Sequence, residues 1–150
     1  MPMSEQNKAH VRRVIEEVYN RGDLAVVDEV AASDLHIHTS AQEIHGREGA
    51  KRYVTALRIG FPDLRFTVEE QIAEGDMVVT RWTARGTHRG EFQNVSPTGR
   101  GIRLTGTDIH RVIGGKIVEC WAHVDELGLM RQLGAVEADP AASGSAGALR

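Results

Sequence analysis

The stretch that decides the fold is residues 102–124, IRLTGTDIHRVIGGKIVECWAHV, in which apolar and polar side chains alternate on both sides of a Gly-Gly pair. A period of two indicates β-strands, and two adjacent glycines favour a tight hairpin turn between them. Two earlier runs, residues 65–73 and 77–88, alternate in the same way and are separated by the turn sequence EGD. The sequence therefore predicts an antiparallel meander of four strands.

The chain before this meander follows a helical period instead. Residues 4–21 carry apolar side chains at i, i+3, i+4 and i+7 spacing, with Ser4 as a possible N-cap and Gly22 as the stop. Similar patterns predict further elements: a short helix after Asp23, a strand over 35–39, a third helix over 50–61 that ends at Gly60 and Pro62, and a last helical turn over 127–133.

Helices followed by an antiparallel meander define an α+β fold, in which the helices cover one face of a curved sheet. Such a sheet forms a cone whose mouth admits a ligand. The length of 150 residues suits one domain, and we assign it to residues 1–137. Residues 138–150, ADPAASGSAGALR, are small and polar, which predicts a flexible C-terminal tail.

The composition of the chain limits the classes of molecule that it is expected to bind. The net charge of -3 argues against nucleic acid and against anionic membranes as partners, and favours a small neutral or amphipathic molecule. Cys120 is the only cysteine, so the chain has no internal disulfide and no multi-thiolate metal site. No run approaches the ~18 apolar residues of a membrane span, and the polar N-terminus lacks a signal peptide, so we expect a cytoplasmic protein.

Strand alternation also sorts side chains between the two faces of the sheet. The arginines within residues 77–88 and 102–112 favour solvent, which turns Trp82, Asp108 and His110 inward. In residues 116–124, one face carries Cys120 and the other carries Trp121 and His123. Both orientations remain open there, because a bulge would exchange them.

Both tryptophans, Trp82 and Trp121, are candidates for the wall of a cavity that binds an aromatic molecule, although a tryptophan on the inner face of a curved sheet is also a common core residue.

Three residues are candidates for acid-base chemistry: Asp108, His110 and Asp125. An acid or imidazole inside an apolar cavity can have its pKa moved toward neutrality. The structural alternatives are that Asp108 and His110 hydrogen-bond each other and that Asp125 caps the last helix. The sequence contains no Gly-x-Ser-x-Gly elbow and no glycine-rich phosphate loop, so nucleophilic catalysis has no support.

A possible metal motif lies earlier in the chain. His36 and His38 form a His-x-His pair, and Glu43 follows five residues after the second histidine, in partial likeness to the cupin motif. Ile102 occupies the place of the later cupin histidine, and the first sixty residues are mostly helical. We therefore expect no metal site, with His36 exposed and His38 facing the pocket, and we expect a chelator to leave activity and melting temperature unchanged.

Five segments, in order along residues 6–134, resemble the SnoaL-like polyketide cyclases, or ester cyclases, of the nuclear transport factor two-like superfamily. They are YNRGDLAVVDEV, GREGAKRYVTALRIGFPDL, EEQIAEGDMVVTRWTARGTHRGEF, SPTGRGIRLTGTDIHRV and GGKIVECWAHVDELGLMRQLG. The resemblance implies a cone-shaped α+β barrel in which a curved mixed sheet packs on N-terminal helices. It also implies a homodimer that pairs through the outer sheet face.

The resemblance further implies an activity: cofactor-free ring closure of a polyketide-like ester by intramolecular aldol condensation. It matches Asp125 in WAHVDELG to the family's acid-base residue and His110 in TDIHRV to its partner, and it places His38 at the cavity mouth. Asp108 or His123 could take the place of Asp125. The alternatives are an isomerase, hydrolase or hydratase that uses the same cavity, or a noncatalytic ligand-binding dimer module.

Overall fold

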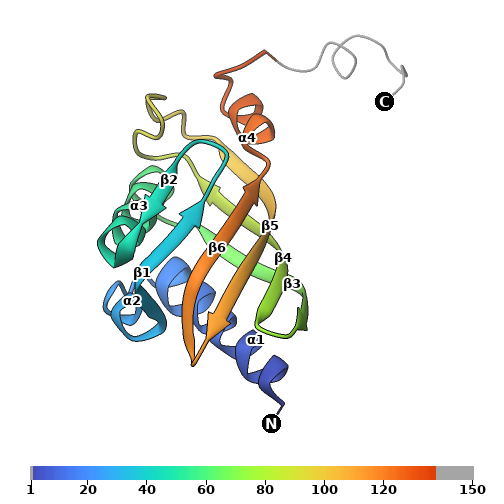
Figure 1. Cartoon of the computed structure of the whole chain (residues 1–150). Helices are drawn as coiled ribbons and strands as arrows, with labels where there is room; N and C mark the ends of the chain where they lie inside the picture. The colour runs from blue at the N-terminus through green and yellow to red at the C-terminus, as the bar shows by residue number, and fades with distance from the viewer. Residues whose placement is uncertain (1, 138–150) are drawn as a thin grey trace, which may run out of the picture.

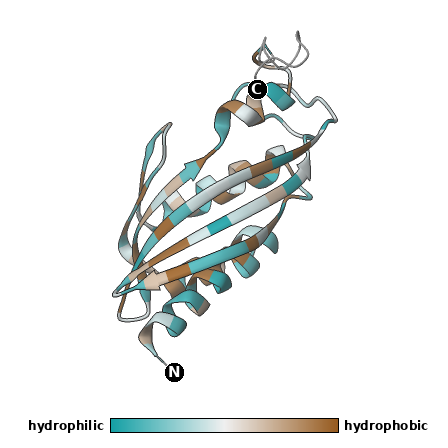
Figure 2. Cartoon of the chain, turned by 90° about the vertical axis from the view of Figure 1, so that its right-hand side faces the viewer, coloured by the Kyte–Doolittle hydropathy of each residue, from teal (hydrophilic) through white to brown (hydrophobic). Residues whose placement is uncertain are grey.

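The computed structural model describes residues 2–137, so the tail predicted for residues 138–150 lies outside the described part of the chain. Six strands form one curved sheet in the order β2-β1-β6-β5-β4-β3, and the helices pack against one of its faces (Figures 1 and 2). This is the α+β architecture expected from the sequence. No helix among the described residues is both long and apolar enough to cross a membrane.

The four strands of the predicted meander form β3 (Arg65–Glu74), β4 (Met77–Thr87), β5 (Gly101–Ile113) and β6 (Lys116–Val124). Consecutive strands pair antiparallel, as expected. The sheet is mixed because β1 (Ala31–His38) lies parallel to β6. A short edge strand, β2 (Glu43–His45), pairs antiparallel with β1 and was not expected from the sequence. A three-residue strand is too short for its alternation to be recognised.

The long N-terminal helix differs from the expectation in two ways. Helix α1 (Met3–Arg13) begins directly after Pro2, whose carbonyl accepts the first backbone hydrogen bonds, so Ser4 lies inside the first turn and is not the N-cap. The helix continues as the π-helix η1 (Val14–Asn20), and Gly22 then ends it with a φ of 74°. In a π-helix residues five apart share a face, and Val14 and Tyr19 accordingly line the same cavity.

The remaining helices are α2 (Ala25–Val30), α3 (Gly46–Gly60) and α4 (Glu126–Gln132). Two clusters of buried apolar side chains hold them to the sheet. The larger cluster joins η1, α2 and α3 to strands β1, β4 and β6, and includes Val18, Val54 and Val78. The smaller cluster surrounds Trp82 and Leu129 at the α4 end of the sheet. The site lies between the two clusters.

Candidate active site

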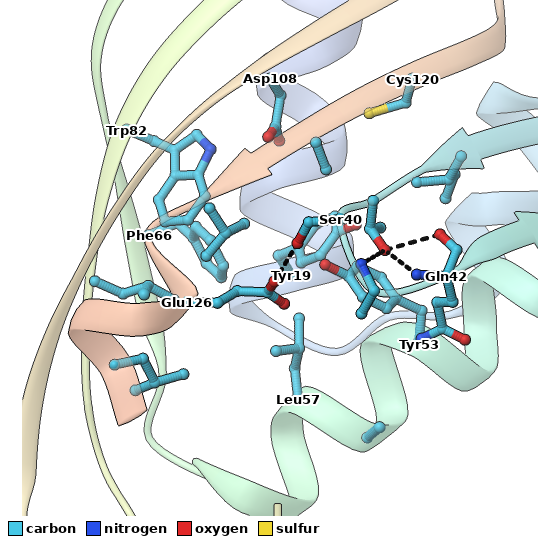
Figure 3. A pocket seen from close by; sticks show the side chains of 18 of the residues that line it. Tyr19, Ser40, Gln42, Tyr53, Leu57, Phe66, Trp82, Asp108, Cys120 and Glu126 are labelled. Carbon is cyan, nitrogen blue, oxygen red and sulfur yellow. Dashed lines mark hydrogen bonds between the residues drawn. The ribbon is translucent and has the colours of Figure 1, made fainter. Parts of the chain in front are cut away.

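The helices and the inner face of the sheet line a cavity of about 280 Å³, called the inner cavity below (Figure 3). Its walls come from η1, α3 and strands β1, β4, β5 and β6, and they are mostly apolar. The loops at residues 39–42 and 91–93, together with α4, form its rim. A cavity of this kind, apolar with a few convergent polar groups, is a typical small-molecule site.

The polar groups at the inner end of this cavity come from β5. Asp108 and His110 are two residues apart on the strand, and both line the cavity, which confirms their predicted inward orientation. Cys120 faces His110 across the β5–β6 pairing, and one donor atom each of Asp108, His110 and Cys120 lie within 4.8 Å of one another. Trp82, also predicted to face inward, points its indole nitrogen toward Asp108 (Figure 3).

Burial changes the pKa values of both Asp108 and His110. Removal from water raises the pKa of Asp108 from 3.8 to about 7, and the Trp82 indole N–H lowers it by a smaller amount. Burial alone lowers the pKa of His110 from 6.5 to about 4, so its imidazole is neutral at pH 7. Asp108 Oδ1 and His110 Nδ1 have no hydrogen-bond partner among the described residues. The cavity therefore presents an acid that exchanges its proton near neutral pH beside an unpaired imidazole nitrogen.

Two tyrosines that the sequence analysis did not select also line the cavity. Tyr19 comes from η1 and Tyr53 from α3. Burial, followed by smaller electrostatic effects that include the negative charge of Asp108, raises the pKa of both phenols, so they remain protonated. The sequence does contain a signal for them, because each is a hydroxyl-bearing side chain among the regularly spaced apolar residues of a predicted helix. Burial also raises the pKa of the Cys120 thiol, which therefore meets the cavity as a weak hydrogen-bond donor and not as a metal-binding thiolate.

Asp125 has a different position. Its Oδ1 accepts a hydrogen bond from the backbone N–H of Gly128 at 3.0 Å, and it is the N-cap of α4. Asp125 lines an open pocket on the outer face of the sheet, together with His123, and it does not line the inner cavity that contains His110. The structure thus does not bring Asp125 and His110 into one cavity, and the capping alternative describes its geometry.

Three other residues selected from the sequence, His38, Trp121 and His123, also lie outside the inner cavity. Ile37 lines the cavity, so strand alternation turns its neighbour His38 to the outer face, where its ring stacks on Trp121 with centroids 5.5 Å apart. The pocket-facing position expected for His38 is therefore not observed. A β-bulge in β6 changes which side chains of the strand face the cavity, as the sequence left open. It lies near the start of the strand, where Val118 has no partner between the pairs formed by Ile117 and Glu119.

The rim of the cavity is held by contacts between distant segments. The Ser40 hydroxyl donates a hydrogen bond to the Glu126 carboxylate of α4 (Figure 3). The hydroxyl of Thr39 donates to the Gln42 carbonyl at 2.8 Å, which closes the turn at the tip of the β1–β2 hairpin. Phe92, which also lines the cavity, packs edge-on against Phe61, with ring centroids 5.2 Å apart. These contacts border the entrance through which a ligand would pass.

The fold and cavity define a class of protein: a small α+β cone that encloses an apolar ligand site with an acid and an imidazole at its inner end. The model of the SnoaL-like polyketide cyclase family matches residues 9–133, and the chain belongs to this family. The expected family is thus confirmed.

Individual relatives agree with this assignment. The chain is 33% identical over 133 residues to aklanonic acid methyl ester cyclase DauD of Streptomyces sp. strain C5, covering 83% of this chain and 79% of the relative. Two solved structures are similar. A proposed SnoaL-like polyketide cyclase from Jannaschia sp. CCS1 has a TM-score of 0.85 at 27% identity, covering 91% of this chain and 96% of the other. IdmH of Streptomyces antibioticus, a proposed polyketide cyclase, has a TM-score of 0.76 at 36% identity, covering 86% and 99%.

Proposed function

We propose that this protein closes a ring in a polyketide-like ester by an intramolecular aldol-type reaction, with Asp108 as the acid-base residue and His110 as the hydrogen-bond donor to the substrate oxygen that becomes negatively charged. The observation that carries the proposal is the position of these two groups two residues apart on the wall of an apolar cavity, where each has a buried polar atom that bonds to none of the described residues. Buried polar atoms without partners are rare in folded proteins, and a substrate that bonds to them would account for their retention.

The proposed reaction needs no added reagent. The Asp108 carboxylate removes a proton from a carbon between two carbonyl groups, and the electron pair of that C–H bond forms an enolate. The enolate carbon then attacks a third carbonyl, forming the ring C–C bond and leaving an alkoxide. The Asp108 carboxylic acid returns the proton to that alkoxide, so the product is an isomer of the substrate. A pKa near the working pH allows one group to perform both transfers.

The remaining cavity groups have supporting roles in this proposal. The neutral imidazole of His110 donates a hydrogen bond to the oxygen on which negative charge develops. The protonated hydroxyls of Tyr19 and Tyr53 are further donors on the opposite wall. The apolar surface around Phe66 and Trp82 folds the substrate so that its two reacting carbons meet, and this proximity supplies a large share of the acceleration.

The test uses aklanonic acid methyl ester, the substrate in the name of the relative DauD, as the first probe, with ring closure followed by chromatography. We expect Asp108→Asn to reduce turnover by ~10²–10⁴-fold, because an amide cannot accept the proton. The matched control is Asp125→Asn, which changes the same chemical group outside the cavity. Full turnover by Asp108→Asn would refute the proposed base.

If wild-type protein binds this ester without converting it, the site is a ligand-binding module or acts on another substrate class. A panel that includes a β-keto ester without a third carbonyl in reach of the enolate carbon distinguishes these cases. Release of an acid from it would favour hydrolysis, and binding alone would favour the noncatalytic alternative.

We further propose that two copies pair through the outer sheet face. The strand register aligns Ile72, Val79, Ile109 and Trp121 in one apolar row across β3, β4, β5 and β6. The row lies on the face away from the helices, and Ile72 is 62% exposed in the single chain. Contiguous apolar surface of this kind is typical of an interface between protein subunits.

A further inference from the structure

The outer face of the sheet carries a cluster of four side chains that the proposed reaction does not use. His36 and His38 alternate on β1 and therefore point to the same side. Glu43 comes from β2, where it pairs with His38, and Glu119 comes from β6, where it lies beside His36 in the parallel register. The first three residues are close in sequence, but Glu119 is 81 residues away from His38.

These side chains are in direct contact. His38 Nδ1 lies 2.7 Å from Glu43 Oε1, and its Nε2 lies 2.7 Å from Glu119 Oε2. His36 Nε2 lies 2.6 Å from the same Glu43 oxygen. A neutral imidazole has one N–H group, so His38 cannot donate to both carboxylates at once. A second proton on His38, a proton on one of the two carboxyl groups, or a bound cation in place of one proton would satisfy both contacts.

The positions suit a bound cation. One donor atom each of His36, His38 and Glu119 lie within 4.8 Å of one another. A tetrahedral zinc ion with ligands at ~2.1 Å holds its donors about 3.4 Å apart, so small side-chain rotations are enough to form the site. The three side chains are 32%, 29% and 31% exposed, which leaves a path for the ion and room for water as a ligand.

Neighbouring rings hold the two histidines in place. His45 stacks on His36 with centroids 4.4 Å apart, and Trp121 stacks on His38 with centroids 5.5 Å apart. Arg111 in turn lies over the Trp121 ring, 5.9 Å from its centroid. Groups that fix the orientation of ligand side chains are typical of metal sites and reduce the entropy lost on binding.

We propose that His36, His38 and Glu119 bind a divalent transition-metal ion of the zinc type, with Glu43 as a fourth ligand or as the hydrogen-bond acceptor that orients the histidines. Two imidazoles with a carboxylate favour Zn²⁺, Ni²⁺ or Cu²⁺ over Mg²⁺ and Ca²⁺, which prefer oxygen donors alone. This proposal replaces the sequence-based expectation of no metal site. The missing ligand of the cupin-like pattern comes from β6.

The ion would act on the fold and not on the reacting atoms. The outer face is opposite the cavity, so the ligands do not approach Asp108. The ion would join the β1–β2 hairpin to β6, and the tip of that hairpin, residues 39–42, borders the cavity entrance. Metal binding would therefore fix the position of one side of the entrance. The proposal does not depend on the cyclase function.

The test is a Zn²⁺ titration of the full-length, chelator-treated protein at pH 8, in competition with a zinc-binding dye. We expect wild-type protein to bind one Zn²⁺ per chain at least tenfold more tightly than Glu119→Gln or His38→Gln. The matched control is His123→Gln, an exposed histidine on the outer face of β6 outside the cluster, which should bind like wild type. Excess Mg²⁺ should not displace the ion, and Zn²⁺ should raise the melting temperature of wild type and of His123→Gln but not of Glu119→Gln or His38→Gln.

A second measurement keeps the result independent of folding defects. Co²⁺ bound by nitrogen and oxygen ligands in a tetrahedral site gives strong visible absorption, which should appear with wild type and be absent with Glu119→Gln, while far-ultraviolet circular dichroism shows both proteins folded. Equal Zn²⁺ affinity in wild type and Glu119→Gln would mean that the His-x-His pair chelates weakly by itself, and it would overturn the proposal. Absence of binding, or loss of binding in His123→Gln, would overturn it as well.

Discussion

Replacing Asp108 by asparagine should stabilise this protein at alkaline pH while it removes the proposed base. Burial raises the pKa of Asp108 from 3.8 to about 7, so the folded state must either bind a proton there or hold a buried charge. At about 1.4 kcal/mol per pKa unit, a difference of about 3 units corresponds to about 4 kcal/mol of destabilisation once the group is fully ionised. Solvent that enters the cavity would screen the charge and reduce this value, so we expect about 2–4 kcal/mol.

The sign follows from the direction of the pKa change. A carboxyl group whose pKa is raised by folding costs nothing below its unfolded pKa, and it costs progressively more as the pH rises from 3.8 through about 7. Ionisation of Asp108 should therefore lower the unfolding free energy of wild type as the pH rises from acid to alkaline values, whereas Asp108→Asn lacks this loss. His110 is present in both proteins, so its own titration cancels in the comparison.

The assay is urea unfolding of wild type and Asp108→Asn at about pH 5 and about pH 8.5, followed by circular dichroism. The advantage of the variant in unfolding free energy should grow by up to about 3 kcal/mol between the two pH values, because about 2 pKa units of the titration lie between them. Asp125→Asn, an exposed helix cap, is the control and should show no such growth. An equal difference at both pH values would refute the assigned acidity of Asp108.

Four other predictions follow from the same geometry. Lowering the pH from 6.5 through about 4 should destabilise wild type by up to about 3 kcal/mol more than His110→Gln in urea unfolding, because the buried imidazole resists protonation; equal acid sensitivity would contradict this. Asp125→Asn should lose only a few tenths of a kcal/mol in thermal unfolding and keep its turnover, since asparagine is also a good N-cap; a large loss of turnover would return Asp125 to the mechanism. Light scattering at micromolar concentration should give a mass near twice 16.5 kDa, and Ile72→Glu should shift it toward the monomer; a monomeric wild type would remove the role assigned to the apolar row. A chelator should leave the rate of ring closure unchanged when assayed with the same ester, and a lost rate restored by Zn²⁺ would mean that a metal takes part.

The sequence by itself determined the fold class and the inward face of the meander. Solvent-seeking arginines set the alternation of β4 and β5, and this local rule correctly turned Trp82, Asp108 and His110 toward the cavity. Family segments spread along the chain identified the SnoaL-like polyketide cyclases. Both kinds of signal are available without knowledge of long-range contacts, because side-chain period and motif order are properties of the linear chain.

Only the tertiary structure decided which candidates meet. Asp125 follows β6 directly, and its turn into α4 directs the carboxylate to the Gly128 N–H and away from His110. The parallel pairing of β1 with β6 brings Glu119 against His38, a contact between residues 81 apart that no local pattern contains. Strand register and bulge position depend on the packing of the whole sheet, since a shift by one residue exchanges its two faces. For this reason the sequence could propose the acid and base candidates and orient those on β5, but it could not show that Asp125 and His38 lie outside the cavity.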